Sequence, residues 1–168
     1  MNNSILVTAG ADGPTSVFLA GKIGISWLNI FGLIIVVLLL VPNIIYALKK
    51  RDRENKCTNK LMIILEQIGR YGSMLLMVFN IGLAEFGFPS VGAFIVYLFG
   101  NILLLVIYWL IWVLYFREKT YWKQMALALI PTFIFLLSGI TMLHLLLVIS
   151  AIIFGTGHIY VTRKNIAE

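Results

Sequence analysis

Long apolar runs separated by short polar turns dominate the chain, and their lengths predict membrane-spanning helices. A hydrocarbon core of about 30 Å needs about 20 helical residues. Three runs meet or approach that length directly, namely 25–48, 61–83 and 91–116. Each is bounded by charged residues or by Gly, Pro and Ser, which typically end helices. The pattern therefore predicts three membrane helices before residue 117.

The apolar stretch from about 122 to 162 is too long for one crossing and just long enough for two. We divide it at "LSGIT" (137–141), because Ser138 and Gly139 are the local residues that favour a turn. This division predicts a fourth helix at about 122–138 and a fifth at about 142–162.

The placement of the basic residues predicts how these helices are oriented. Six of the thirteen Lys and Arg residues lie in "KKRDRENKCTNK" (49–60), and five more fall between the third helix and the first residues of the fourth or after the fifth. With five helices, all eleven lie on one side. The other side holds only Lys22, and Arg70 lies within a helix. Cytoplasmic loops carry an excess of Lys and Arg. We therefore expect a protein of the plasma (cytoplasmic) membrane, with its N-terminus outside the cell and its C-terminus in the cytoplasm.

The composition supports the same class. Of the 168 residues, 61% are hydrophobic and 12% are charged. A soluble domain carries about 25% charged residues. We therefore expect an all-α integral membrane protein whose first partner is the lipid bilayer. Residues 25–168 would form one five-helix transmembrane domain. The basic residues behind the net charge of +6 lie mainly in loops beside apolar segments, so we expect no nucleic-acid partner.

Cysteine and histidine are too few for a metal centre or an internal disulfide. Cys57 is the single cysteine, and no CxxC or mixed His/Cys ligand spacing occurs. His144 and His158 are fourteen residues apart in the chain. This separation places them about 21 Å apart along one helix. We therefore predict no metal site, and an exposed free thiol at Cys57.

The first 24 residues form an apolar–break–apolar unit, "SILVTAGADGPTSVFLAGKIG" (4–24), that differs from the other runs. Gly and Pro in "GADGP" interrupt regular structure, and the stretch lacks the basic start of a secretory signal. A unit of this length does not span a membrane by itself. We expect residues 1–24 to form a re-entrant or surface-lying segment that precedes the five helices.

The motif "GADGPTSVFLAGK" resembles the Gly-(Gly/Ala)-Ala-Asp-Gly-Pro-Thr motif in beta subunits of sodium-translocating decarboxylases, over about fifteen residues. The resemblance implies that Asp12 is an ion-linked carboxylate and that Thr15 helps to shape the break around it. It also makes sodium a candidate ligand. Carboxylate and backbone oxygens are suitable ligands for such a hard cation.

The second predicted helix carries an intramembrane polar stripe. Glu66 and Arg70 are four residues apart and share a face, so they can pair. Ser73 and Asn80 continue that face at helical spacing. Charged groups at membrane depth are costly and are commonly paired or functional. The stripe is therefore either packing between helices or the lining of a cavity.

Two further sequence features concern helix kinks. Pro42 lacks an N–H and leaves the carbonyl of Leu38 without its helical donor, and we expect Asn43 to help satisfy it. Pro131 has the same effect on Leu127.

No arrangement of nucleophile, base and orienting group stands out, and the catalytic motifs GxSxG and HExxH are absent. The sequence favours a non-enzymatic, transport-related or accessory membrane protein, which we expect to be a homo-oligomer or to have a membrane partner. Two alternatives remain: a small membrane enzyme that acts on a lipid, and a regulatory or structural subunit of a membrane complex.

Overall fold

The computed structural model describes residues 23–24, 27–49, 57–81 and 87–167. Within these ranges the chain forms five α-helices, each long and apolar enough to cross a membrane, so the prediction of five such helices is confirmed. They are α1 (Ile30–Lys49), α2 (Lys60–Val78), α3 (Val91–Arg117), α4 (Tyr121–Thr141) and α5 (Leu145–Ala167).

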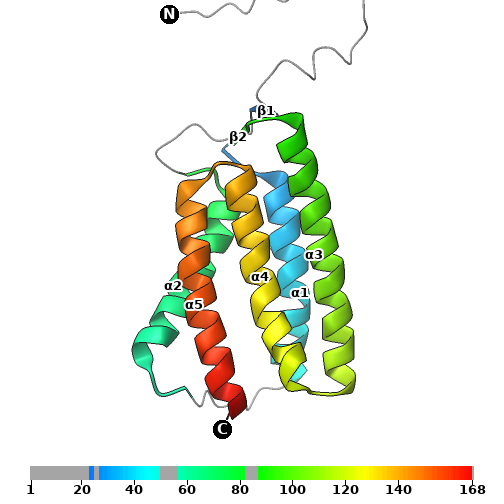
Figure 1. Cartoon of the computed structure of the whole chain (residues 1–168), viewed down its shortest axis with the longest axis vertical. Helices are drawn as coiled ribbons and strands as arrows, with labels where there is room; N and C mark the ends of the chain where they lie inside the picture. Colours follow the sequence, from blue (N-terminus) through cyan, green and yellow to red (C-terminus); the bar gives the residue numbers. More distant parts are fainter. Residues whose placement is uncertain (1–22, 25–26, 50–56, 82–86, 168) are drawn as a thin grey trace, which may run out of the picture.

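The helices run alternately up and down in one bundle (Figure 1), so that their ends form two faces. We call one face the basic end. It contains the end of α1, the start of α2, the α3–α4 turn and the end of α5. Every Lys of the described part of the chain lies there, as do Arg117 and Arg163. We call the opposite face the turn end, because the α4–α5 turn lies there.

Glycines bring α2 and α5 into direct backbone contact. A Cβ on Gly157 would lie 2.6 Å from the backbone nitrogen of Glu66, and a Cβ on Gly69 would meet the backbone of Phe154. Nearer the turn end, Ser150 Oγ of α5 donates to the Gly69 carbonyl of α2 at 3.2 Å and lies 3.1 Å from Ser73 Oγ. Small residues thus fix the spacing of these two helices, as in many membrane bundles.

The turn between α4 and α5 lies later than the sequence predicts. Ser138 and Gly139 are inside α4, which continues to Thr141. The chain turns at Leu143, whose φ of 54° is left-handed, and the His144 N–H donates to the Gly139 carbonyl at 2.8 Å. This bond pattern ends many helices, usually with glycine at the left-handed position. The hydroxyl of Ser138 bonds the Ile134 carbonyl within the helix, so it does not initiate a turn.

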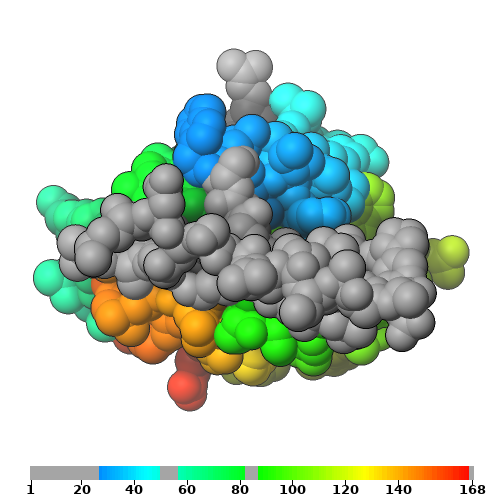
Figure 2. Space-filling view, turned by 90° about the horizontal axis from the view of Figure 1, so that it is seen from above, coloured from blue at the N-terminus to red at the C-terminus, as the bar shows by residue number. Residues whose placement is uncertain are grey.

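One asparagine joins four segments at the turn end. The Asn29 N–H donates to the Val78 carbonyl at the end of α2, and its Oδ1 accepts from the Gly32 N–H in the first turn of α1. Its Nδ2 lies 3.3 Å from the hydroxyl of Tyr97 in α3 and 3.5 Å from the sulfur of Met142. Figure 2 looks onto this end, with the start of α1 on one side and the α4–α5 turn on the other.

Two short strands, β1 (Ile23–Gly24) and β2 (Gly87–Phe88), also pair at this end. They are antiparallel, with Ile23 opposite Phe88, and the hydropathy pattern did not predict them. A bridge between Leu28 and Phe79 continues the link between the start of α1 and the end of α2. Accordingly, α2 ends at Val78 instead of continuing to residue 83.

The first two helices touch at the turn end and separate toward the basic end. A Cβ on Gly32 would collide with the Met77 carbonyl oxygen, so α1 and α2 are in contact there. In Figure 1, α2 leans away from α1 toward the basic end. Side chains of both helices, among them Ile44 of α1 and Tyr71 of α2, line a cavity there.

One sequence-based prediction is wrong, and another concerns residues outside the described ranges. Cys57 is buried, with 7% of its surface exposed, so the prediction of an exposed thiol is wrong. The predicted re-entrant or surface-lying segment, with Asp12 and Thr15, lies outside the described residues except for β1.

Candidate binding cavity

Three ionisable side chains from α2 and α5 form one cluster. Glu66 is buried, and its Oε1 accepts a hydrogen bond from the Nη2 of Arg70, one turn further along α2. The same oxygen lies 2.8 Å from Nδ1 of His158 on α5. A carboxylate can only accept, so the proton of this second bond lies on Nδ1 of the imidazole. Gly157, packed on the Glu66 backbone, brings His158 within this distance.

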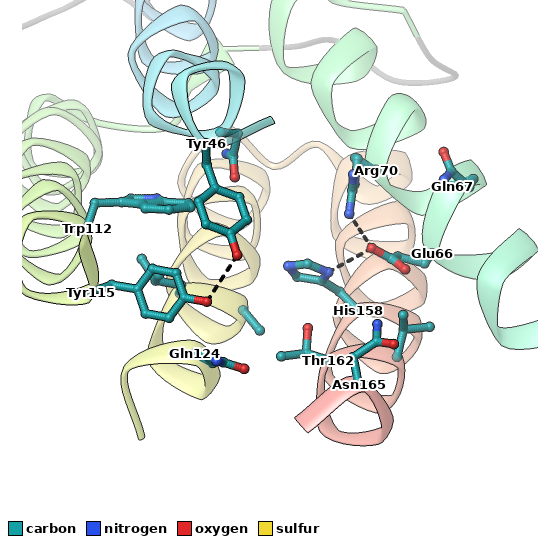
Figure 3. A pocket seen from close by; sticks show the side chains of 14 residues that line it. Tyr46, Glu66, Gln67, Arg70, Trp112, Tyr115, Gln124, His158, Thr162 and Asn165 are labelled. Carbon is teal, nitrogen blue, oxygen red and sulfur yellow. Dashed lines mark hydrogen bonds and ion pairs between the residues drawn. The ribbon is translucent and has the colours of Figure 1, made fainter. Parts of the chain in front are cut away.

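The cluster forms one wall of a cavity of about 380 Å³ at the basic end (Figure 3). Arg70 and His158 extend into the space from α2 and α5, and the far edge of the His158 ring faces the opposite wall. The ring also stacks on Phe154, with centroids 4.8 Å apart, which fixes its plane. A volume of this size suits a small ligand.

The opposite wall is aromatic. It is built from Tyr46 of α1 and from Trp112 and Tyr115 of α3, whose rings pack 5.3–5.7 Å apart. The Tyr46 and Tyr115 hydroxyls are 3.3 Å apart and lie on the cavity side, as Figure 3 shows. Gln124 of α4 and Thr162 and Asn165 of α5 complete the polar rim.

A second, more apolar cavity of about 460 Å³ lies deeper, between α1 and α2. Its apolar lining comes from α1, α2, α4 and α5 and includes Leu39, Leu40, Met74, Pro131, Phe135 and Phe154. Ile44 and Tyr71 line it as well and are 53% and 63% exposed. The cavity therefore opens on the side of the bundle, where α1 and α2 separate.

The two cavities adjoin. Asn43, Arg70, Leu127 and His158 line both of them, so the same four side chains form the boundary between the polar and the apolar space. A molecule with one polar and one apolar part would fit this pair of cavities across that boundary.

The polar stripe predicted on α2 divides between the two roles that the sequence left open. Glu66 and Arg70 line the cavity, whereas Ser73 is fully buried against Ser150 of α5 and serves packing. Asn80 lies beyond the end of α2, where its N–H donates to the Trp27 carbonyl. The four residues thus do not form one site.

The carbonyl that Pro42 leaves without a helical donor has a different partner from the one predicted. Nε1 of Trp109 in α3 donates to the Leu38 carbonyl at 3.1 Å. Asn43 instead donates to the Leu39 carbonyl at 2.9 Å and to the Tyr108 hydroxyl at 2.8 Å. The asparagine side chain therefore connects α1 to α3 at the boundary of the two cavities.

Neither the aromatic wall nor the contact between His158 and Glu66 was predicted from the sequence. The signal that could have suggested the contact is Gly157 next to His158, because a glycine allows a neighbouring helix to approach the adjacent side chain. The aromatic wall had no comparable signal, since Tyr46 and Trp112 come from helices that local spacing cannot relate.

Comparison of the chain with protein-family models, with curated proteins and with solved structures finds no match. Within the described ranges, no three His, Cys, Asp or Glu side chains are close enough together to hold a metal ion.

Proposed function

We propose that this chain is an integral protein of the cytoplasmic membrane, with its basic end in the cytoplasm and its N-terminus outside. Large apolar side chains cover the outer surface of the bundle, including Leu103 and Leu110 of α3, which are 60% and 59% exposed. Such a surface favours contact with lipid over water. The basic residues at one end support the orientation.

We further propose that the protein binds a small amphiphilic molecule in the paired cavities, in a transport-related or accessory role. The observation that carries this proposal is the shared boundary of Asn43, Arg70, Leu127 and His158. A polar group would occupy the space near the basic end, and an apolar chain would reach the space between α1 and α2. The side opening gives such a molecule a route from the bilayer that bypasses the aqueous phase.

Thermal unfolding in a neutral detergent tests this proposal. Single-chain amphiphiles with equal chains and different head groups are added to the purified protein, and the midpoint temperature is measured. A ligand at 100 times its Kd stabilises the folded state by about 2.7 kcal/mol, so a binder should give a clear shift. A cavity-filling variant, Ala47→Phe, places a ring in the apolar cavity and should reduce the shift. The proposal fails if no amphiphile shifts the midpoint.

A small membrane enzyme that acts on a lipid is the second candidate. The contact of 2.8 Å between Glu66 and His158 favours it. A carboxylate that orients an imidazole is common in general base catalysis. The far edge of the His158 ring faces the cavity, where a substrate would lie (Figure 3). Turnover of a lipid that disappears in His158→Gln, with binding retained, would support this candidate over the first.

A further inference from the structure

We propose that the ligand of the paired cavities is a single-chain amphiphile with an anionic head group, held by Arg70. This inference rests on the proposed binding function and adds the chemical class of the ligand. It depends on the balance of donors and acceptors around the polar cavity and on the shape of the apolar one.

The donors of Arg70 exceed its partners in the described helices. A guanidinium group has five N–H donors. The structure shows one of them, on Nη2, bonded to Glu66. About a third of the Arg70 side chain is exposed, at the boundary of the two cavities. An anionic head group would accept from the remaining donors, and such charge-assisted bonds are stronger than neutral ones.

The negative charge that could attract a cationic head group is already compensated. Oε1 of Glu66 accepts from both Arg70 and His158, and Glu66 is buried behind them. A cation in the cavity would lie beside the Arg70 guanidinium, which would repel it. The lysines and arginines at the basic end extend the same positive potential, which favours an anion.

The apolar cavity limits the rest of the molecule. Its volume is about 460 Å³. This lies within the range that one small ligand fills. The opening beside Ile44 and Tyr71 lets the remainder of a chain leave the bundle between α1 and α2. One alkyl chain fits this space. The other apolar cavity of the described residues lies along α3, beside Leu105 and Leu110, and shares no lining residue with this one, so it does not extend the site for a second chain.

Calorimetric titration of the full chain in a neutral maltoside detergent tests the inference. The probes are dodecyl phosphate, dodecylphosphocholine and dodecyltrimethylammonium, which share a chain and differ in head-group charge. We expect dodecyl phosphate to bind at least tenfold more tightly than the other two. Inorganic phosphate should bind at least a hundredfold more weakly than dodecyl phosphate, because it lacks the chain. This arm separates an anionic amphiphile from a free anion.

Two matched variants locate the head group. Arg70→Gln should weaken binding of dodecyl phosphate about 10- to 150-fold, the effect of losing a hydrogen bond to a charged group. Arg117→Gln removes the same charge from an exposed position at the same end, outside the cavity, and should change the affinity less than twofold. If Arg70→Gln does not fold, Arg70→Lys keeps the charge and reduces the number of donors. The head-group series on the native protein remains decisive in that case.

The outcomes separate the inference from the function on which it rests. Equal affinity for dodecyl phosphate and dodecylphosphocholine, or equal effects of Arg70→Gln and Arg117→Gln, would overturn the anionic head group and leave amphiphile binding in place. Binding of inorganic phosphate as tight as that of dodecyl phosphate would overturn the amphiphile. If none of the three dodecyl probes binds, the proposed function itself is wrong.

Discussion

Nδ1 of His158 lies 2.8 Å from Oε1 of Glu66, although 92 residues separate the two in the chain. The contact joins the fifth helix to the second and places an imidazole and a guanidinium on one carboxylate oxygen. It also positions both nitrogen-bearing side chains at the boundary between a polar and an apolar cavity. The stability of the bundle and the chemistry of the cavity therefore depend on the same group.

The first prediction concerns the ion pair between Glu66 and Arg70. Removing one partner of a buried ion pair costs about 3–5 kcal/mol when burial is complete, because the other charge loses its compensation. Arg70 is about one third exposed, so Arg70→Gln should lie at the low end of that range. Glu66→Gln should also destabilise the bundle, and the double variant should lose less than the sum of the two. Equilibrium unfolding in mixed micelles measures these losses, and strictly additive values would contradict the pairing.

The second prediction concerns the glycine contact that supports the cluster. Gly157→Ala would place a Cβ 2.6 Å from the Glu66 nitrogen, so α2 and α5 would have to move apart. Overpacking of this kind costs about 1–3 kcal/mol. The control is Gly92→Ala in α3, where the nearest heavy atom would lie 3.7 Å away. Its change should stay within about 0.5 kcal/mol. Because alanine has the higher helix propensity, a loss must come from packing, and similar losses in the two variants would show that the contact with α2 does not set the effect.

The third prediction concerns pH and His144, which lies in the turn between α4 and α5. Burial lowers the pKa of His144 below its ordinary value of 6.5. Its Nδ1 also accepts a hydrogen bond from the Leu147 N–H at 3.2 Å. Only an unprotonated nitrogen can accept in this way. Between the folded and the unfolded pKa the unfolded chain binds more protons. The contribution of His144 to the free energy of unfolding should therefore be complete above about pH 6.5 and fall as the pH drops below it.

A matched variant isolates this effect. His144→Asn keeps a side-chain acceptor at the start of α5 and removes the titrating group. Unfolding of both proteins is measured from pH 5 to pH 8, and the difference between them should grow toward low pH. Parallel curves would mean that other groups account for the acid sensitivity.

The fourth prediction concerns the N-terminal motif, which lies outside the described residues. If Asp12 is an ion-linked carboxylate, sodium should raise the thermal midpoint in detergent, and Asp12→Asn should abolish the rise. Saturating sodium would supply about 2.7 kcal/mol at 100 times its Kd. Asp52→Asn, in the basic loop, removes the same charge from a position without the motif and should leave the response unchanged. Equal midpoints in sodium and in a bulky organic cation would leave the motif a structural role only.

The fifth prediction concerns orientation. Because Cys57 is buried, its labelling would not report the side of the membrane, and introduced cysteines are needed. In a Cys57→Ser background, Thr58→Cys at the basic end should react only with reagents that enter the cell. Pro89→Cys at the turn end should react with an impermeant maleimide on intact cells. Both positions are exposed in the structure. The reverse labelling would place the basic end outside.

The sequence by itself determined the number of long apolar helices, because spacing and length along the chain are sufficient to recognise such segments. It also placed Glu66 and Arg70 on one face of α2, since residues four apart on a helix are neighbours. The sequence predicted the ends of the helices less accurately. The α4–α5 turn formed at Leu143 and not at Ser138, because hydrogen bonds from Met142, Leu143 and His144 back into α4 ended the helix there.

Only the tertiary structure decided which surfaces of the helices meet. Local spacing does not relate Glu66 to His158, or Tyr46 to Tyr115, because each pair comes from helices distant in the chain. Their meeting depends on contacts such as that of Gly157 with the backbone of Glu66, whereas α1 and α2 touch at Gly32 and then diverge. Close approach at two glycines and separation elsewhere produced the cavities. That is a property of how whole helices pack, and no single helix carries it.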